Sequence, residues 1–186
     1  MTNETLDVIR RRRSVRSFAP DQITDEALTA IVEAAAYAPN GGGEAWHFTV
    51  IQNAGVLAQL DRLAKQFAAA CGLPWLEALG KDEAFHSVYH APTVILVSGD
   101  EQNVCAESDT AAATQNLLLA AESLGIASCW GYFVTQAFQT DEGKAMRGQL
   151  GIPEGYRVYT STMLGQRAGD APQAAARKAG TVTYVR

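Results

Sequence analysis

The sequence predicts an α+β fold in which several helices surround a sheet of about five strands. Two observations carry this prediction. Segments with helical spacing of apolar residues alternate with short segments rich in β-branched and aromatic residues, and no internal repeat or low-complexity linker interrupts them. With 186 residues, 47% of them hydrophobic, the chain can bury a core of its own. Residues 1–186 are therefore predicted to form a single domain.

Four shorter segments carry helical signals. The first spans residues 4–13 and ends in arginines, where the helix dipole favours cations. The second begins after Thr24, a predicted N-cap, and stops before Pro39. Residues 56–67 form a third amphipathic stripe, and a short fourth helix is expected over residues 143–150.

The longest helical segment reads SDTAAATQNLLLAAESLG and begins at residue 108. Ser108 or Asp109 is the expected N-cap. Alanines and leucines occupy every side, so we expect the helix to be buried nearly all round, by its own subunit or by another. Gln115 and Asn116 lie in this apolar setting and are expected to bond to backbone or interface groups.

Strand signals occur at residues 46–52, 93–99, 126–133 and 157–164. The second of these, TVILVSG, is almost continuously apolar, which is typical of a strand covered on both faces. The final TVTYVR alternates like a strand and is expected to pair with a sheet edge of a partner chain. Residues 72–85 are less regular and are interpreted as a lid or a packing excursion.

Composition excludes several function classes. The net charge of -5 would repel a polyanion, so a nucleic-acid partner is not expected. The chain shows no signal-peptide pattern and no apolar run that could span a bilayer, so we expect a cytoplasmic protein without membrane contact. Three scattered cysteines suggest reduced thiols, and three histidines lack metal-ligand spacing, so no metal is assigned.

The segment RRRRSVRSF, beginning at residue 10, holds five arginines in seven residues. A nucleic-acid contact, a solvated helix end and a socket for one compact anion are its alternative explanations. No GxxxxGK loop and no GxGxxG after a strand is present, so any phosphate must be held by side chains. Arginine suits that task because its planar guanidinium binds phosphate bidentately and keeps its charge.

The candidate anion ligands come from two places in the chain. The first set straddles the predicted helix end, where its side chains can converge on one point, and consists of Arg12, Arg13, Ser14 and Arg16. Arg177 and Lys178 form the other adjacent basic pair. Two basic clusters around one dianion would explain both sets, whereas Arg10 and Arg11 are interpreted as solvated helix-end charges.

Six segments, taken in order, resemble the flavin-dependent nitroreductase family. They are RRRSVRSF (11–18), APNGGGEAWHFTVIQN (38–53), YHAPTVILVSGD (89–100), DTAAATQNLLLAAESLGIASCWG (109–131), LGIPEGYRVY (150–159) and a closing RK before a VTYV strand. The resemblance implies a nitroreductase-like fold with a mostly antiparallel sheet, in a homodimer whose C-terminal arms are exchanged. It also implies noncovalent FMN at the subunit interface, NADH or NADPH as reductant, and ping-pong hydride transfer to a small-molecule acceptor such as a nitroaromatic or a quinone.

The resemblance assigns roles residue by residue. The set Arg12, Arg13, Ser14 and Arg16 matches contacts to the FMN phosphate and ribityl chain, and Arg177 with Lys178 matches the closing phosphate-binding pair. Trp130 and Gly131 match the point where the chain passes the isoalloxazine, often with a backbone N–H directed at N5. No residue is assigned as a catalytic acid or base, which suits a reaction governed by positioning.

The loop APNGGGEAW departs from the family pattern, APSxxNxQPW. The asparagine that bonds the flavin's polar edge in relatives is missing, and Asn40 or a glycine backbone group such as Gly43 is the expected substitute. This departure leaves two further hypotheses open: a flavin-binding module without turnover, and a family relative acting as a dehalogenase or an ene reductase. Cys129 lacks a cationic neighbour in sequence and is interpreted as a packed thiol.

Overall fold

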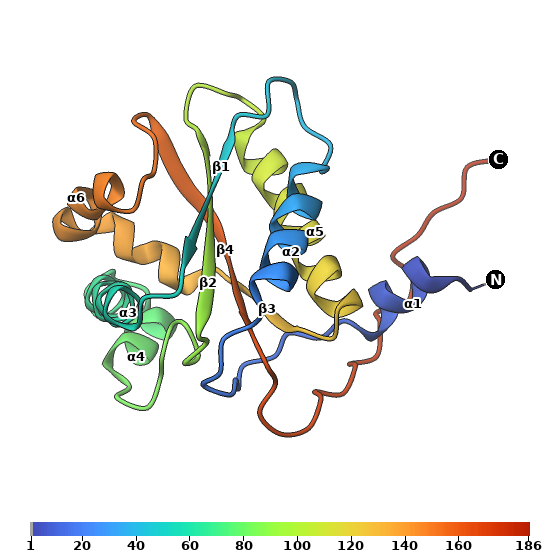
Figure 1. The fold of residues 1–186 in the computed structure, drawn as a ribbon, viewed down its shortest axis with the longest axis horizontal. Helices are drawn as coiled ribbons and strands as arrows, with labels where there is room; N and C mark the ends of the chain where they lie inside the picture. Colours follow the sequence, from blue (N-terminus) through green and yellow to red (C-terminus); the bar gives the residue numbers. More distant parts are fainter. Residues whose placement is uncertain (1) are drawn as a thin grey trace.

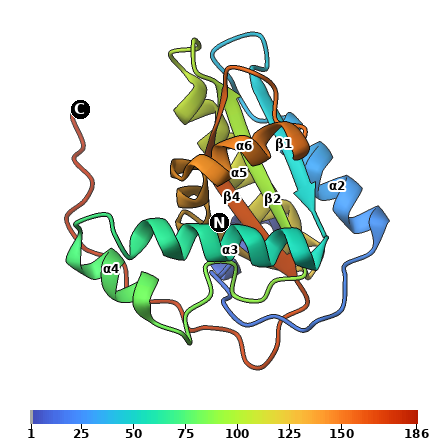
Figure 2. The ribbon, with the colours of Figure 1, turned by 90° about the vertical axis from the view of Figure 1, so that its left-hand side faces the viewer.

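A computed structural model describes residues 2–186 as a four-stranded antiparallel sheet between two layers of helices (Figure 1). The strands lie in the order β1-β2-β4-β3. Helices α2 and α5 cover one face of the sheet, whereas α3, α4 and α6 lie on the other face (Figures 1 and 2). In chain order the elements are α1 (Glu4–Arg11), α2 (Asp25–Ala36), β1 (Trp46–Ile51), α3 (Ala54–Ala68), α4 (Pro74–Lys81), β2 (Thr93–Asp100), α5 (Ala106–Ser123), β3 (Ala127–Gly131), the 3₁₀ helix η1 (Phe133–Gln139), α6 (Asp141–Gln149) and β4 (Tyr156–Gly165).

The sheet explains the continuous apolar sequence of β2. This strand lies between β1 and β4, and its first seven residues are buried. Ile95 and Val97 pack with the α2 and α5 side chains, and Val94 and Leu96 pack with the α3 side. A strand covered on both faces needs apolar residues at every position, which is what the sequence supplies.

A β-bulge interrupts the pairing of β2 with β4. Val97 pairs with Thr160, but the next residue, Ser98, pairs with Val158. Tyr159 is therefore the extra residue on β4. Bulges of this kind bend a strand and redirect a side chain.

Local capping signals were good predictors of helix α2. The Thr24 side chain accepts a hydrogen bond from the backbone N–H of Ala27 at 3.2 Å, which confirms the expected N-cap. Helix α1 is shorter than expected, because it ends at Arg11 and not at Arg13.

The predicted N-cap of α5 is wrong. The helix begins at Ala106 after Cys105, and the Asp109 carboxylate instead accepts a hydrogen bond from the distant Gly41 N–H. Within this chain α5 is buried along one side only, and Gln115 is exposed. Asn116 donates to the Ala34 carbonyl at 2.9 Å, as expected of a polar group in this setting.

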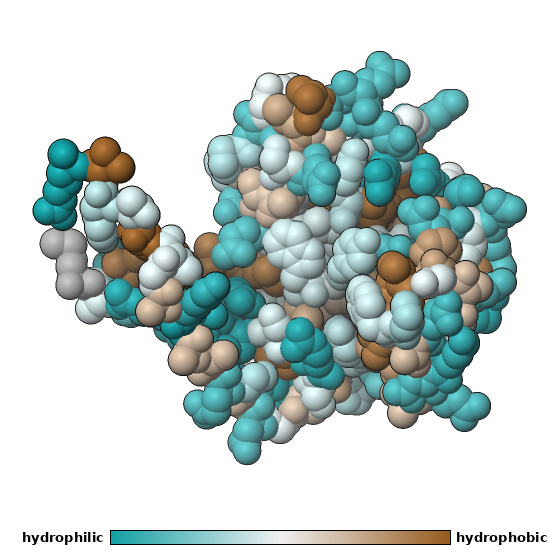
Figure 3. All heavy atoms as spheres, turned by 180° about the vertical axis from the view of Figure 1, so that it is seen from behind, coloured by the Kyte–Doolittle hydropathy of each residue, from teal (hydrophilic) through white to brown (hydrophobic). Residues whose placement is uncertain are grey.

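The sheet has four strands within residues 2–186, not five. The expected fifth, residues 181–186, forms no strand in the single chain. Residues 170–186 are exposed throughout and extend from the body as an arm, with Val182, Tyr184 and Val185 in contact with solvent (Figure 3). An alternating strand sequence needs a neighbouring strand to satisfy its backbone, and this chain provides none for it.

Among residues 2–186, no helix is long and apolar enough to cross a membrane.

Candidate flavin site at the edge of strand β3

The segment after α1 lies along the free edge of β3. Ser14 forms a parallel bridge with Ser128, and the Val15 N–H donates to the Ser128 carbonyl at 2.9 Å. Farther along, Phe18 bridges to Arg167 after the end of β4. The arginine-rich segment is thereby held in an extended conformation beside the sheet.

Extended backbone sends successive side chains to opposite sides, and this alternation divides the arginines. Arg12 and Arg16 lie close enough to Cys129 for their charges to act on its thiol. Arg13 points the other way, where its Nη1 donates to the carbonyls of Arg10 and Arg12, both at 2.6 Å. Arg12 and Arg16 thus both lie within electrostatic range of Cys129, whereas the Arg13 guanidinium is held by backbone carbonyls.

Arg12 and Arg16 are cations without an acidic partner. No carboxylate among residues 2–186 forms an ion pair with either of them, and the Nη1 atom of Arg12 is buried without any hydrogen-bond partner. The Arg16 guanidinium lies 5.8 Å from the centre of the Tyr89 ring. A buried, unsatisfied guanidinium nitrogen is costly unless an acceptor binds it, so these residues fit an anionic group such as the phosphate of FMN.

Cys129 is a packed thiol, as its sequence suggested, but for a different reason. Its side chain is buried, and burial raises the pKa of the thiol, whereas the nearby charges of Arg16 and Arg12 lower it less strongly. Sequence reasoning missed these cations because they lie more than a hundred positions away. Burial outweighs them, so the thiol stays protonated at neutral pH and is a poor nucleophile.

Trp130 presents backbone groups on the same free edge. The Ser128 carbonyl faces outward to Val15, and backbone groups two residues apart in a strand point the same way, so those of Trp130 face outward too. The Trp130 side chain is 37% exposed. An unpaired N–H beside two free arginines can orient a flat polar ligand.

Gly131 follows Trp130 at the end of β3 and has a packing role. A Cβ atom at this position would collide with the Met163 side chain and would lie 2.6 Å from the Ser161 hydroxyl. That hydroxyl donates to the Gly131 carbonyl at 2.6 Å. Close packing against β4 therefore requires glycine here, whether or not a ligand approaches.

Asn40 and Gly43 lie at the opposite end of the sheet. Their loop leads into Trp46, which pairs with Gly99, whereas Ser14 lies beside Ser128 at the level of Leu164 and Thr93. The separation is roughly 20 Å along the strands and about 19 Å across four strand spacings. Within one chain this loop and the arginines do not meet.

Asp109 holds the loop in place, a role that sequence reasoning did not find. Its Oδ2 accepts the Gly41 N–H at 3.0 Å, and a Cβ atom at Gly41 would lie 2.6 Å from the Cys105 Sγ. The Asn40 Oδ1 accepts from the Gly42 N–H at 2.9 Å, closing a tight turn. The hydrogen bond between residues 41 and 109 joins distant parts of the sequence, so no local sequence signal could indicate it.

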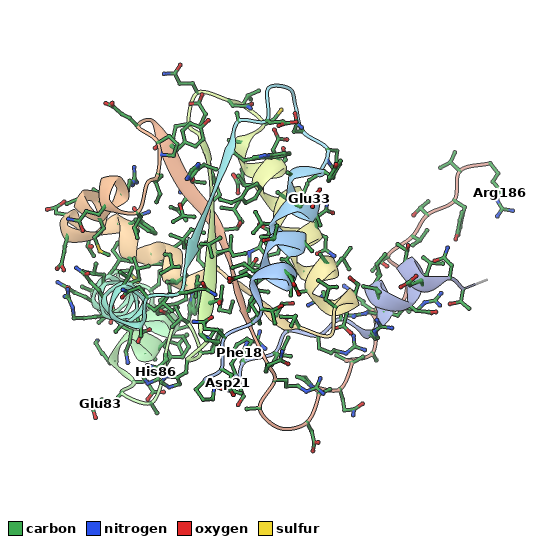
Figure 4. The ribbon with its side chains drawn as sticks, in the orientation of Figure 1. Phe18, Asp21, Glu33, Glu83, His86 and Arg186 are labelled. Carbon is green, nitrogen blue, oxygen red and sulfur yellow. The ribbon has the colours of Figure 1, made fainter. Side chains whose placement is uncertain are left out.

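Arg177 and Lys178 lie in the exposed arm, away from the other candidate ligands of their own chain. Figure 4 shows Arg186 at the far end of the arm, remote from Phe18, which lies beside the sheet. The structure of the single chain thus separates three groups of candidate residues: the arginines at β3, the 40–43 loop and the arm.

Another hollow lies beside α3 and has a volume of about 650 Å³. Its polar lining includes Asp61 and His86, whose Oδ2 and Nδ1 atoms lie 3.1 Å apart, and His90, whose ring is 3.8 Å from that of His86. His86 appears below α3 in Figure 4. Residues 2–186 contain no group of three or more His, Cys, Asp or Glu side chains arranged to hold a metal ion.

Comparisons with known proteins place this geometry in a family. The model of the nitroreductase family matches residues 9–166. A nitroreductase of Bacteroides fragilis, solved with bound FMN, is 41% identical and superposes with a TM-score of 0.93 over all of both chains. A nitroreductase of Desulfitobacterium hafniense, also solved with bound FMN, is 32% identical with a TM-score of 0.92, again over all of both chains.

A sequence relative from Archaeoglobus fulgidus agrees with these structures. It is provisionally named an NADH dehydrogenase/NAD(P)H nitroreductase and is 33% identical over 170 residues, which cover 87% of this chain and 84% of the relative. The family match covers the arginine segment, the β3 edge and the whole sheet. The chain belongs to the nitroreductase family.

Proposed function

We propose that this protein is an FMN-dependent NAD(P)H oxidoreductase that reduces nitroaromatic, quinone or related small-molecule acceptors. The observation that carries the proposal is the buried Arg12 Nη1 without a hydrogen-bond partner, beside Arg16 and the free edge of β3. Family relatives with bound FMN at 41% and 32% identity support the choice of cofactor.

FMN, when bound, supplies the acceptance and delivery of hydride. The chain's own residues bind and orient it: Arg12 and Arg16 provide positive charge and N–H donors for an anionic group. The outward backbone N–H of Trp130 provides a directional donor for the ring. Arg13 belongs to the expected ligand set, but its guanidinium is bound to the carbonyls of Arg10 and Arg12.

We further propose that the working site lies between two copies of the chain. The loop containing Asn40 and Gly43 lies far from the arginines of its own chain, so one flavin reaches both only if the second contribution comes from a partner. The exposed arm carries Arg177 and Lys178 and an unpaired strand-like end, which supports exchange of the arm between partners.

The test is spectroscopic. The purified protein is expected to be yellow, and anaerobic NADH or NADPH should bleach its flavin absorbance. Steady-state oxidation of NAD(P)H with a quinone should exceed the rate with free FMN at the same concentration. A colourless protein that shows no change on titration with FMN would contradict the proposal, and a flavin-loaded protein without turnover would support a binding module instead.

A further inference from the structure

The free edge of the sheet continues past β3 into a second hollow. The last pair between β3 and β4 is Gly131 with Ser161, so residues 156–160 of β4 have no paired strand on this side. A hollow of about 340 Å³ occupies the place that β3 leaves open. Tyr132, the residue after Gly131, lines it, so the hollow begins directly beyond the proposed flavin position.

Two tyrosines and an arginine form the walls of this hollow. Tyr159 is the extra residue of the β-bulge, and it lines the hollow. The Arg157 guanidinium lies 5.3 Å from the centre of the Tyr159 ring. After the end of β3, the Thr135 hydroxyl donates to the Tyr132 carbonyl at 2.6 Å and stabilises the turn that carries Tyr132.

Some polar groups of the hollow are engaged within the chain, since the Gln136 Nε2 donates to the Thr135 hydroxyl at 3.3 Å. The two charged side chains are not. Glu107, Gln136 and Gln139 also line it. Within residues 2–186 neither Arg157 nor Glu107 forms an ion pair. A planar aromatic ring can stack beside tyrosine, and an arginine fork next to it matches a carboxylate or a nitro group.

We propose that this hollow binds the electron acceptor, and that it selects planar aromatic acceptors with an anionic or strongly hydrogen-bond-accepting edge directed at Arg157. The inference rests on the proposed function, because the hollow gains this role only beside a bound flavin. Tyr159 supplies the stacking surface, and Arg157 binds the anionic edge. Glu107 disfavours a second negative substituent on the same ring.

The experiment compares 4-nitrobenzoate with nitrobenzene, which lacks the carboxylate. Replacing Arg157→Leu should raise the Kd and KM for 4-nitrobenzoate about tenfold to a hundredfold, as expected for loss of a charged hydrogen bond, and change those for nitrobenzene about twofold or less. Replacing Tyr159→Leu should weaken the binding of both compounds about two- to tenfold. Arg62→Leu, an exposed arginine on α3, is the matched control and should leave both unchanged.

Reduction of ferricyanide, an inorganic acceptor with no ring to stack, separates this inference from the proposed function. The Arg157→Leu variant should retain FMN and oxidise NAD(P)H with ferricyanide at the unmutated rate. The acceptor site would be contradicted if Arg157→Leu lowered the rates with ferricyanide and with 4-nitrobenzoate equally. It would also be contradicted if Arg157→Leu left the Kd and KM for 4-nitrobenzoate unchanged. If the unmutated protein reduces no acceptor, the proposed function fails. Calorimetric titration with 4-nitrobenzoate then still decides whether the hollow binds the ring.

Discussion

Each arginine between positions 10 and 16 is distinguished by the polar groups within its reach. Arg11 lies 3.0 Å from a carboxylate oxygen of Glu122, and Arg13 bonds to carbonyls of the helix end. Arg12 and Arg16 have neither kind of partner. Arg10 lies 3.7 Å from a carboxylate oxygen of Asp7. The five arginines therefore comprise three that have partners within the chain and two that are available to a ligand.

This division predicts unequal effects on FMN affinity. The Arg12→Ala and Arg16→Ala variants should each weaken FMN binding about tenfold to a hundredfold, because each loses a charge-assisted hydrogen bond. Arg11→Ala, which loses only a solvent-exposed ion pair, should bind FMN as the unmutated protein does. Titration followed by flavin fluorescence measures all three, and equal losses would show that the arginines act only through their summed charge.

Cys129 predicts a pH dependence of stability. Burial raises the pKa of this thiol in the folded chain, so its stabilising contribution is complete below the ordinary thiol pKa of about 8.5. It is lost as the pH rises toward the folded-state pKa. Urea unfolding between pH 7 and pH 10 should show a decline in the free energy of unfolding that is smaller in Cys129→Ala, and parallel curves would rule out this cause.

At the scale of elements, the glycines of strand β3 and helix α6 should respond to substitution in opposite ways, because only the first is closely packed. Replacing Gly131→Ala forces a methyl group against Met163 and Ser161 and should destabilise the fold by about 1–3 kcal/mol. Replacing Gly148→Ala in α6, where a Cβ atom meets nothing within 4 Å, should stabilise it by about 0.5–1 kcal/mol. Thermal unfolding of the two variants should shift the midpoint in opposite directions, and a shared direction would contradict the packing argument.

Elements with local signals were predicted well from the sequence. Thr24 caps α2 through an N–H three residues away, and the apolar run of β2 follows from burial on both faces. The start of α5 was predicted wrongly because Asp109, a good capping residue, is engaged by Gly41 far away in sequence. The direction of the Arg12 and Arg13 side chains could not be predicted either, since it depends on the bridge between Ser14 and Ser128.

At the scale of the whole molecule, the arm is the part that the single chain does not explain. It exposes Val182, Tyr184 and Val185, and its backbone has no strand beside it. The count of five strands was therefore wrong for one chain. The expected pairing with a partner's sheet edge stays a prediction.

Removing residues 170–186 tests the arm directly. Because those residues are exposed and outside the core, the truncated chain should keep its unfolding midpoint as a monomer. It should dimerise more weakly and bind FMN less tightly, since both the exchanged strand and Arg177 with Lys178 are lost. Sedimentation equilibrium and flavin titration measure the two effects, and an unchanged dimer would refute arm exchange.

The distance between the 40–43 loop and the arginines of the same chain predicts complementation between two defective variants in the proposed dimer. A variant lacking Arg12 and Arg16 and a variant with a disrupted loop are each expected to be inactive alone. When the two are mixed, one of the two sites in each hybrid dimer receives an intact arginine pair from one chain and an intact loop from the other. Two defective proteins should therefore restore part of each other's activity, up to half that of the unmutated dimer in every hybrid formed.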